Sequence, residues 1–191
     1  MGRQAITRMK SNIKNMTYCG IFAALIIVLT MISIPMPTGI PITLQTFAVA
    51  LCGFFLGSRL GALSVAVYLA LGAIGLPVFS GFAGGIGKIA GVTGGFMWGF
   101  VIMVLLCGIM NNRSLKGKGK AAASIVFGVL GLICCHILGV IQFSLVSGNG
   151  LIEAAMIASV PYLVKDVISV AAAFGVSVLL KTALKKANLP A

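Results

Sequence analysis

The sequence predicts an all-α integral membrane protein with six transmembrane helices and both termini in the cytoplasm. Of its 191 residues, 60% are hydrophobic and 8% are charged, and the mean hydropathy is +1.16. A soluble domain cannot bury that much apolar surface, whereas a lipid bilayer accommodates it. The net charge of +12 comes from basic residues outside the apolar runs, as expected for cytoplasmic segments. We therefore expect the basic residues to interact with the lipid bilayer and not with nucleic acid.

The distribution of charge and hydropathy divides the chain into three parts. Residues 1–16 are expected to form a basic cytoplasmic tail, residues 17–186 a single six-helix membrane domain, and residues 187–191 a C-terminal tail. Prolines that cannot continue a helix separate the first two spans and end the third, and Ser58-Arg59 forms a short turn between the second and third. The six spans are predicted at about residues 18–34, 44–57, 60–76, 92–110, 122–145 and 158–180.

Basic residues set the predicted orientation. With both termini inside, twelve of the fourteen Lys and Arg residues lie in the cytoplasm. The exceptions are Lys88 and Lys165, which this orientation assigns to the outer half, close to Asp166. Because the positive-inside preference disfavours both lysines there, we expect a group on the outer side that requires positive charge.

The candidate binding site is centred on Asp166, one of two acidic residues in the chain. An ionised carboxylate in the middle of a spanning helix costs about 2.5–3.5 kcal/mol on insertion scales, so such residues are rare and commonly functional. Helical periodicity puts Tyr162, Asp166 and Ser169 on a narrow arc, with Lys165 at its edge. A helix-end ion pair between Lys165 and Asp166 is the alternative. The other acidic residue, Glu153, is expected in a polar loop.

A glycine-rich segment, five cysteines and one histidine do not predict nucleotide binding, metal binding or catalysis. Residues 81–90 match loose dinucleotide and phosphate-binding patterns, but no buried strand can precede them between two spans, and the glycine spacing is wrong. The five cysteines lie in apolar runs and are expected to be buried hydrophobes. His136 is interpreted as a satisfied or pocket-edge residue, not a metal ligand. One Asp and one His in the spans cannot form a Mg²⁺ cluster or a triad, so we expect no catalytic residue, metal site or enzyme.

A proline-rich segment carries a family resemblance. Residues 35–46 (PMPTGIPITLQT) resemble the proline-rich loop and Pro-x-Thr-x-Gln-Thr signature of the BioY family, the biotin-binding S-components of energy-coupling factor (ECF) transporters. The resemblance continues through GSRLGA, YLALGAIGLPVF and GVTGGF, at residues 57–62, 68–79 and 91–96. Many members carry a lysine three residues after the sixth-helix aspartate, where this chain has Ser169.

The resemblance implies an ECF S-component-like fold and a non-enzymatic, multi-pass protein of a prokaryotic cell membrane. Such a protein captures biotin with high affinity from outside, as a transported ligand, and uses no cofactor. The implied partners are a transmembrane coupling subunit and two ABC-type ATPases. Gly20 and Ala24 form a small-residue strip on the first helix, which resembles the family's contact with the coupling subunit.

Biotin suits the residues around Asp166. Its ureido N–H groups can donate to this carboxylate, a charge-assisted contact worth about 1.5–3 kcal/mol. Its own carboxylate requires a cation, for which Lys88 is the first candidate and Lys165 the second. The glycine-rich segment 80–91 is expected to close over the ligand as a lid. The other predicted substrate-binding residues are aromatic or polar: Thr43, Gln45, Phe79, Phe82, Phe96, Tyr162 and Ser169.

Three other functions are less favoured. A self-sufficient secondary transporter of a small carboxylated vitamin commonly has two repeats with interrupted helices, and this sequence shows no clear repeat. A small intramembrane enzyme lacks the catalytic side chains. A purely structural membrane protein leaves Lys88 and Lys165 on the outer side without explanation.

Overall fold

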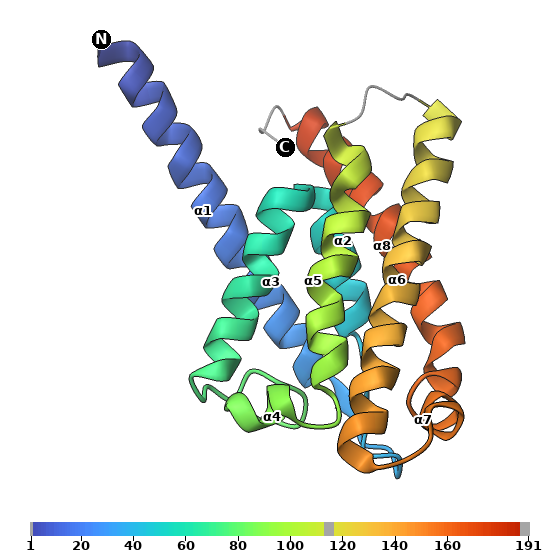
Figure 1. Ribbon diagram of the computed structural model, residues 1–191. Helices are drawn as coiled ribbons and strands as arrows, with labels where there is room; N and C mark the ends of the chain where they lie inside the picture. Colours follow the sequence, from blue (N-terminus) through green and yellow to red (C-terminus); the bar gives the residue numbers. More distant parts are fainter. Residues whose placement is uncertain (1, 113–116, 188–191) are drawn as a thin grey trace.

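The computed structural model describes residues 2–112 and 117–187, which form a bundle of α-helices (Figure 1). Two strands of two residues each, β1 and β2, pair antiparallel. The elements in chain order are α1 (Gly2–Met31), β1 (Ser33–Ile34), β2 (Ile42–Thr43), α2 (Gln45–Leu56), α3 (Ser58–Ala73), α4 (Ile86–Ala90), α5 (Gly94–Gly108), the 3-10 helix η1 (Ile109–Asn112), α6 (Gly117–Ser147), α7 (Leu151–Ala158) and α8 (Val160–Lys186).

Four helices of the described chain are long and apolar enough to cross a membrane. They cover Asn12–Met31, Gly94–Asn111, Gly119–Ser147 and Val160–Lys186. The helices α2 and α3 are also apolar but have 12 and 16 residues. At about 1.5 Å per residue, both are shorter than the hydrocarbon core of about 30 Å. The prediction of an all-α membrane protein is confirmed, with four full-length apolar helices and two shorter ones.

The short helix α2 lies at the centre of the bundle. It contacts α1, α3, α5 and α8, and ten of its twelve residues are buried. A helix covered on all sides needs no polar face, which explains why its sequence is apolar all round. Its surroundings are mostly protein, so its length need not match the thickness of a bilayer.

Glycines allow α2 and α5 to approach closely. A Cβ atom at Gly53 would lie 2.6 Å from Cys107 Cβ and 2.7 Å from the carbonyl oxygen of Val104, so only glycine fits there. Gly57 forms the turn between α2 and α3 with φ +85°, a conformation that favours glycine. A Cβ atom at Gly61 would lie 2.8 Å from Val104 Cγ2. Gly53 and Gly61 therefore serve packing inside the bundle, and Gly57 serves the turn between α2 and α3.

Three segments predicted as tail or loop contain helix. Residues 2–16 belong to α1, although they were expected to form a polar tail. The prediction that Glu153 lies in a loop is wrong, because this residue belongs to α7. The segment 77–91 contains the helix α4. The helices α4 and α7 have five and eight residues, which is too short for a periodic pattern to distinguish them from a loop.

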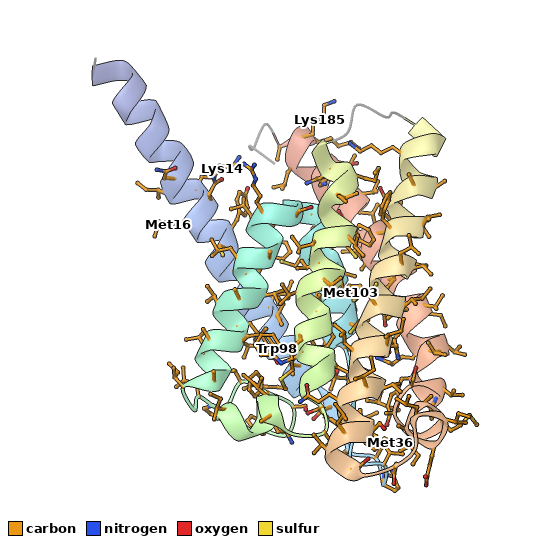
Figure 2. The ribbon with its side chains drawn as sticks, in the orientation of Figure 1. Lys14, Met16, Met36, Trp98, Met103 and Lys185 are labelled. Carbon is orange, nitrogen blue, oxygen red and sulfur yellow. The ribbon has the colours of Figure 1, made fainter. Side chains whose placement is uncertain are left out.

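The two ends of the bundle differ in structure. At one end lie α4, α7 and the β1–β2 pair, and we call this the loop end (Figure 1). At the opposite end α1 begins and α8 ends, and we call this the basic end. Lys14 and Lys185 lie at the basic end and Met36 at the loop end (Figure 2).

Candidate functional site

A narrow cavity lies at the loop end, between α2, α5, α6 and α8. The space open to the centres of water-sized spheres is about 70 Å³, within about 610 Å³ of empty space that includes the mouth. The aromatic and aliphatic part of the wall includes Phe96, Met97, Phe100 and Leu132. The polar part of the wall includes Thr43, Gln45, Thr46, Thr93, His136, Tyr162, Lys165 and Asp166. Apolar walls with a few converging polar groups are typical of small-molecule sites.

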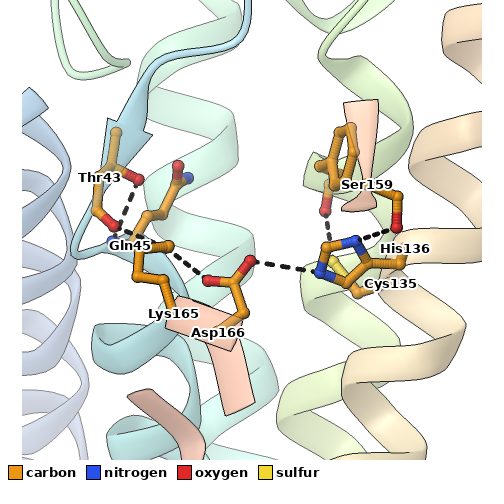
Figure 3. Close-up of polar contacts among 8 residues, drawn as sticks. Thr43, Gln45, Cys135, His136, Ser159, Lys165 and Asp166 are labelled. Carbon is orange, nitrogen blue, oxygen red and sulfur yellow. Dashed lines mark hydrogen bonds and ion pairs between the residues drawn. The ribbon is translucent and has the colours of Figure 1, made fainter. Parts of the chain in front are cut away.

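Asp166 is the acidic centre of this cavity and lies between two basic side chains (Figure 3). Its Oδ2 lies 3.2 Å from His136 Nε2, and its Oδ1 lies 2.5 Å from Lys165 Nζ in an ion pair. The side chain of Asp166 is 7% exposed. Removing either partner would leave a buried charge less compensated, which is commonly costly. Among the described residues, no hydrogen bond of regular geometry reaches Oδ1, so this oxygen retains acceptor capacity.

His136 connects the carboxylate to the residue between α7 and α8. Its Nδ1 lies 2.8 Å from Ser159 Oγ, and its ring packs edge-on against Phe96 with the ring centroids 5.7 Å apart. An ionised carboxylate can only accept hydrogen bonds, so Nε2 must carry the proton that Asp166 receives. In the neutral ring, Nδ1 then accepts a hydrogen bond from the Ser159 hydroxyl. These contacts fix the orientation of the imidazole and hold one carboxylate oxygen in place.

Lys165 links the carboxylate to the proline-rich segment. Its ammonium group donates a hydrogen bond of 2.9 Å to the backbone oxygen of Thr43, in addition to the ion pair with Asp166. The Lys165 side chain is 29% exposed. The side chain of Lys165 is therefore more exposed than that of Asp166, which is 7% exposed.

Tyr162 closes the cavity toward the same proline-rich segment. Its hydroxyl donates to the backbone oxygen of Ile40 at 2.5 Å and lies 2.7 Å from Thr38 Oγ1. Tyr162, Ile40 and Phe143 belong to a small hydrophobic cluster at the loop end. The phenol thus fixes the irregular segment between β1 and β2 onto α8.

Gln45 is held in place by a buried tyrosine. Its Nε2 donates a hydrogen bond of 2.9 Å to the hydroxyl of Tyr68 on α3. The ring of Phe79 packs edge-on against Tyr68, with the ring centroids 5.5 Å apart. Phe79 also occupies the space that a side chain at Gly72 would need. Phe79 therefore supports Gln45 from behind the cavity wall.

Six of the ten predicted substrate-binding residues lie in the cavity wall: Thr43, Gln45, Phe96, Tyr162, Lys165 and Asp166. The other four do not line it. Phe79 is fully buried behind the wall, and Ser169 is buried along α8 beyond Asp166. Phe82 is 68% exposed in a turn with φ +56°, and Lys88 is half-buried on α4. Ligand contact by these four residues stays a prediction, and for the last two it requires movement of the segment 80–91.

His136 is a site residue that the predicted substrate-binding set does not include. Its interpretation as a satisfied or pocket-edge residue is confirmed, because it lines the cavity and contacts Asp166 directly. The available signal was that the only histidine lies in an apolar run, where an ionisable side chain normally faces a partner or a cavity. His136 and Asp166 are 30 positions apart in the sequence, so the sequence did not indicate that they are partners.

The predicted contact strip for the coupling subunit faces outward. Gly20 and Ala24 are both exposed on α1, and a Cβ atom at Gly20 would have no neighbour within 4 Å. The strip thus does not pack inside the monomer. Within the described residues, no group of three His, Cys, Asp or Glu residues is arranged to hold a metal ion.

These features define a multi-pass membrane protein with an internal cavity suited to a small polar molecule. The sequence profile of the BioY family matches residues 4–186. The chain belongs to the BioY family.

Relatives and a solved structure agree with this membership. The chain is 42% identical to the biotin transporter BioY of Rhodobacter capsulatus over 139 residues, which cover 72% of this chain and 73% of that protein. It is 37% identical to the biotin transporter BioY of Thermotoga maritima, with 85% and 92% covered. The fold resembles the crystal structure of the S-component for biotin from an ECF-type ABC transporter, with a TM-score of 0.77, 27% identity, and 91% and 93% covered. Membership of a transporter family agrees with the expectation that the chain is not an enzyme.

Proposed function

We propose that this protein is the high-affinity substrate-capture subunit of a biotin uptake transporter. The observation that carries the proposal is the buried carboxylate of Asp166 in the wall of a polar cavity, flanked by His136 and Lys165. Membership of the BioY family and likeness to an S-component for biotin support biotin as the ligand. The Oδ1 atom of Asp166 retains acceptor capacity, which a ureido N–H group can use.

Charge balance supports a second cation in the ligand complex. Asp166 and Lys165 compensate each other at 2.5 Å, so this ion pair adds no net charge to the cavity. A bound biotin adds one carboxylate, and an uncompensated charge in a dry cavity is costly. Lys165 can meet that carboxylate from the mouth of the cavity only by sharing its charge with Asp166. Lys88 is the other lysine that the proposed orientation assigns to the outer half, and closure of the segment 80–91 as a lid would supply the missing positive charge.

The proposal includes an orientation in the membrane. The six spans are α1, α2, α3, α5, α6 and α8, with the basic end in the cytoplasm and the loop end outside a prokaryotic cell. The twelve-to-two distribution of basic residues supports this orientation, because eleven of the lysines and arginines lie before residue 17, in the segment 113–120 or after residue 180. The irregular segment 32–44 extends the short helix α2 toward the outer surface.

The proposal also includes the transport partners. An S-component captures its substrate and does not hydrolyse ATP, so delivery requires a transmembrane coupling subunit and two ABC-type ATPases. The exposed strip of Gly20 and Ala24 on α1 supports a close helix–helix contact with the coupling subunit, because small residues let helices approach in lipid.

A binding titration tests the proposal. The purified full-length chain in detergent is titrated calorimetrically with biotin, biotin amide and thiamine. We expect saturable binding of biotin at one site per chain, weaker binding of the amide and none of thiamine. Absence of saturable biotin binding by a folded sample, or equal binding of thiamine, would contradict the proposed function.

A further inference from the structure

A second pocket lies at the basic end, far from the candidate biotin site. It is formed between α1, α2, α3, η1 and α8, and the space open to the centres of water-sized spheres is about 490 Å³. Three of its lining residues are lysines: Lys14 on α1, and Lys181 and Lys185 on α8. Lys14 and Lys185 point toward this end of the bundle from different helices (Figure 2). The pocket is therefore large, open and positively charged.

The chain has no acidic side chain near these lysines. Its two acidic residues are Glu153 and Asp166, which belong to α7 and to the polar cavity at the loop end. Lys181 Nζ donates to two neutral acceptors, the backbone oxygen of Phe54 at 2.7 Å and the side-chain oxygen of Asn111. Neutral acceptors satisfy N–H groups but do not cancel charge. The positive charge of the pocket is therefore suited to an anion from outside the chain.

The lysine at the base of the pocket is held in a fixed position. Asn111 donates from Nδ2 to the backbone oxygen of Phe55 at 3.3 Å, so the amide that accepts from Lys181 is itself anchored. The Lys181 ammonium also lies 5.9 Å from the centroid of the Phe55 ring. An ammonium group has three N–H donors, and two of them have protein acceptors here. Lys181 can thus direct its third donor to an oxyanion, while Lys14 and Lys185 contact it from the rim.

The rest of the lining indicates which kind of anion fits. Tyr18, Phe55, Leu56 and Leu60 give the pocket an aromatic and aliphatic wall beside the ammonium groups. An inorganic anion would use only the charges, whereas an amphiphile with a phosphate group and acyl chains would use both. Basic pockets between transmembrane helices are suited to lipid headgroups, and a lysine near an anionic membrane surface contributes about 1 kcal/mol to such binding.

We propose that this pocket binds the phosphate group of an anionic phospholipid. The ammonium groups of Lys14, Lys181 and Lys185 surround the phosphate oxygens, and the apolar wall formed by α1, α2 and α3 contacts the upper part of the acyl chains. The proposal does not rest on biotin as the ligand of the other cavity, because the two sites share no residue.

Native mass spectrometry of the full-length chain tests the proposal. The protein is incorporated into nanodiscs that contain equal parts of phosphatidylglycerol and phosphatidylcholine, released in the gas phase, and examined for retained lipid. We expect one phosphatidylglycerol to be retained in preference to phosphatidylcholine. The variant K14Q/K185Q should lose this preference, since about fivefold weaker binding for each lysine amounts to about twenty-five-fold for both.

A neighbouring lysine provides the matched control. Lys186 follows Lys185 on α8 and is exposed, but it does not line the pocket, so K186Q should retain the lipid as the wild type does. Biotin binding by all variants checks that they are folded. Equal retention of both lipids by the wild type, or equal losses in K186Q and K14Q/K185Q, would overturn the proposal. If millimolar inorganic phosphate displaces the lipid in detergent, the pocket would be a site for the free anion, and the proposal that it binds a lipid would be overturned.

Discussion

The loop end and the basic end of this bundle use lysine in opposite ways. At the loop end, Lys165 lies 2.5 Å from Asp166, and His136 contacts the other carboxylate oxygen, so charge is compensated within the protein. At the basic end, Lys14 and Lys185 belong to a pocket that neither acidic residue of the chain lines. A compensated site distinguishes ligands through oriented hydrogen bonds, whereas an uncompensated one selects chiefly by charge. One end is thus suited to recognise a particular molecule and the other a class of anions.

The largest contrast between the ends should appear in their accessibility from outside the cell. Gly119 and Gly150 are both exposed, and a Cβ atom added at either would have no neighbour within 4 Å, so cysteine fits at both positions. In a cysteine-free background, an impermeant maleimide added to whole cells should label G150C and leave G119C unlabelled. Labelling of G119C but not G150C would reverse the proposed orientation, and permeabilised cells provide the control in which both react.

The next largest effect should come from the acidic centre of the loop end. Asp166→Asn keeps the shape of the side chain but replaces a charged acceptor with a neutral amide. Losing about 1.5–3 kcal/mol of charge-assisted hydrogen bonding should weaken biotin binding roughly ten- to two-hundred-fold, measured by calorimetric titration. Glu153→Gln is the matched control, since Glu153 is the other acid, is exposed on α7 and does not line the cavity. Unchanged affinity in folded Asp166→Asn would refute the assigned role.

A smaller effect on binding, which depends on the ligand, should distinguish Lys88 from Lys165 as the cation that contacts the ligand carboxylate. If Lys88 closes over the ligand carboxylate, Lys88→Gln should weaken the binding of biotin about tenfold, a loss of about 1.4 kcal/mol. The binding of biotin amide, which lacks that carboxylate, should weaken much less. Lys165→Gln should weaken both ligands, because Lys165 also holds Asp166 in an ion pair. If Lys88→Gln lowers the affinity for biotin and for biotin amide by a comparable factor, this lysine would instead be assigned to folding or to the lid.

The smallest effect on binding should come from the strip on α1. Gly20→Leu and Ala24→Leu add bulk to an exposed face outside the cavity, so biotin affinity should change by less than about twofold, within the range of surface substitutions. Because bulk prevents close helix–helix approach in lipid, ATP-driven uptake and co-purification of the coupling subunit should fall severalfold. A loss of binding as large as the loss of uptake would contradict a role of the strip in the contact with the coupling subunit alone.

The long apolar helices were predictable from the sequence, and so was the role of Asp166 as a buried charge. Hydropathy and prolines mark the spans, and a carboxylate in an apolar run is rare enough to identify by itself. The contact between His136 and Asp166 was not predictable, because it depends on the rotation of α6 against α8, which no periodicity encodes. Phe79 shows the same limit, since an aromatic residue beside a predicted site can line the wall or support it from behind. Only packing distinguishes the two.

The hydrogen bond from Tyr162 to Ile40 sets an order of events during synthesis. The two residues are 122 positions apart, so the segment between β1 and β2 leaves the ribosome long before the tyrosine that fixes it. Until α8 has been made and inserted, neither Lys165 nor Tyr162 can contact that segment. A chain that stops before residue 160 can insert its earlier helices but lacks one wall of the cavity. Ligand binding can therefore begin only when translation is nearly complete.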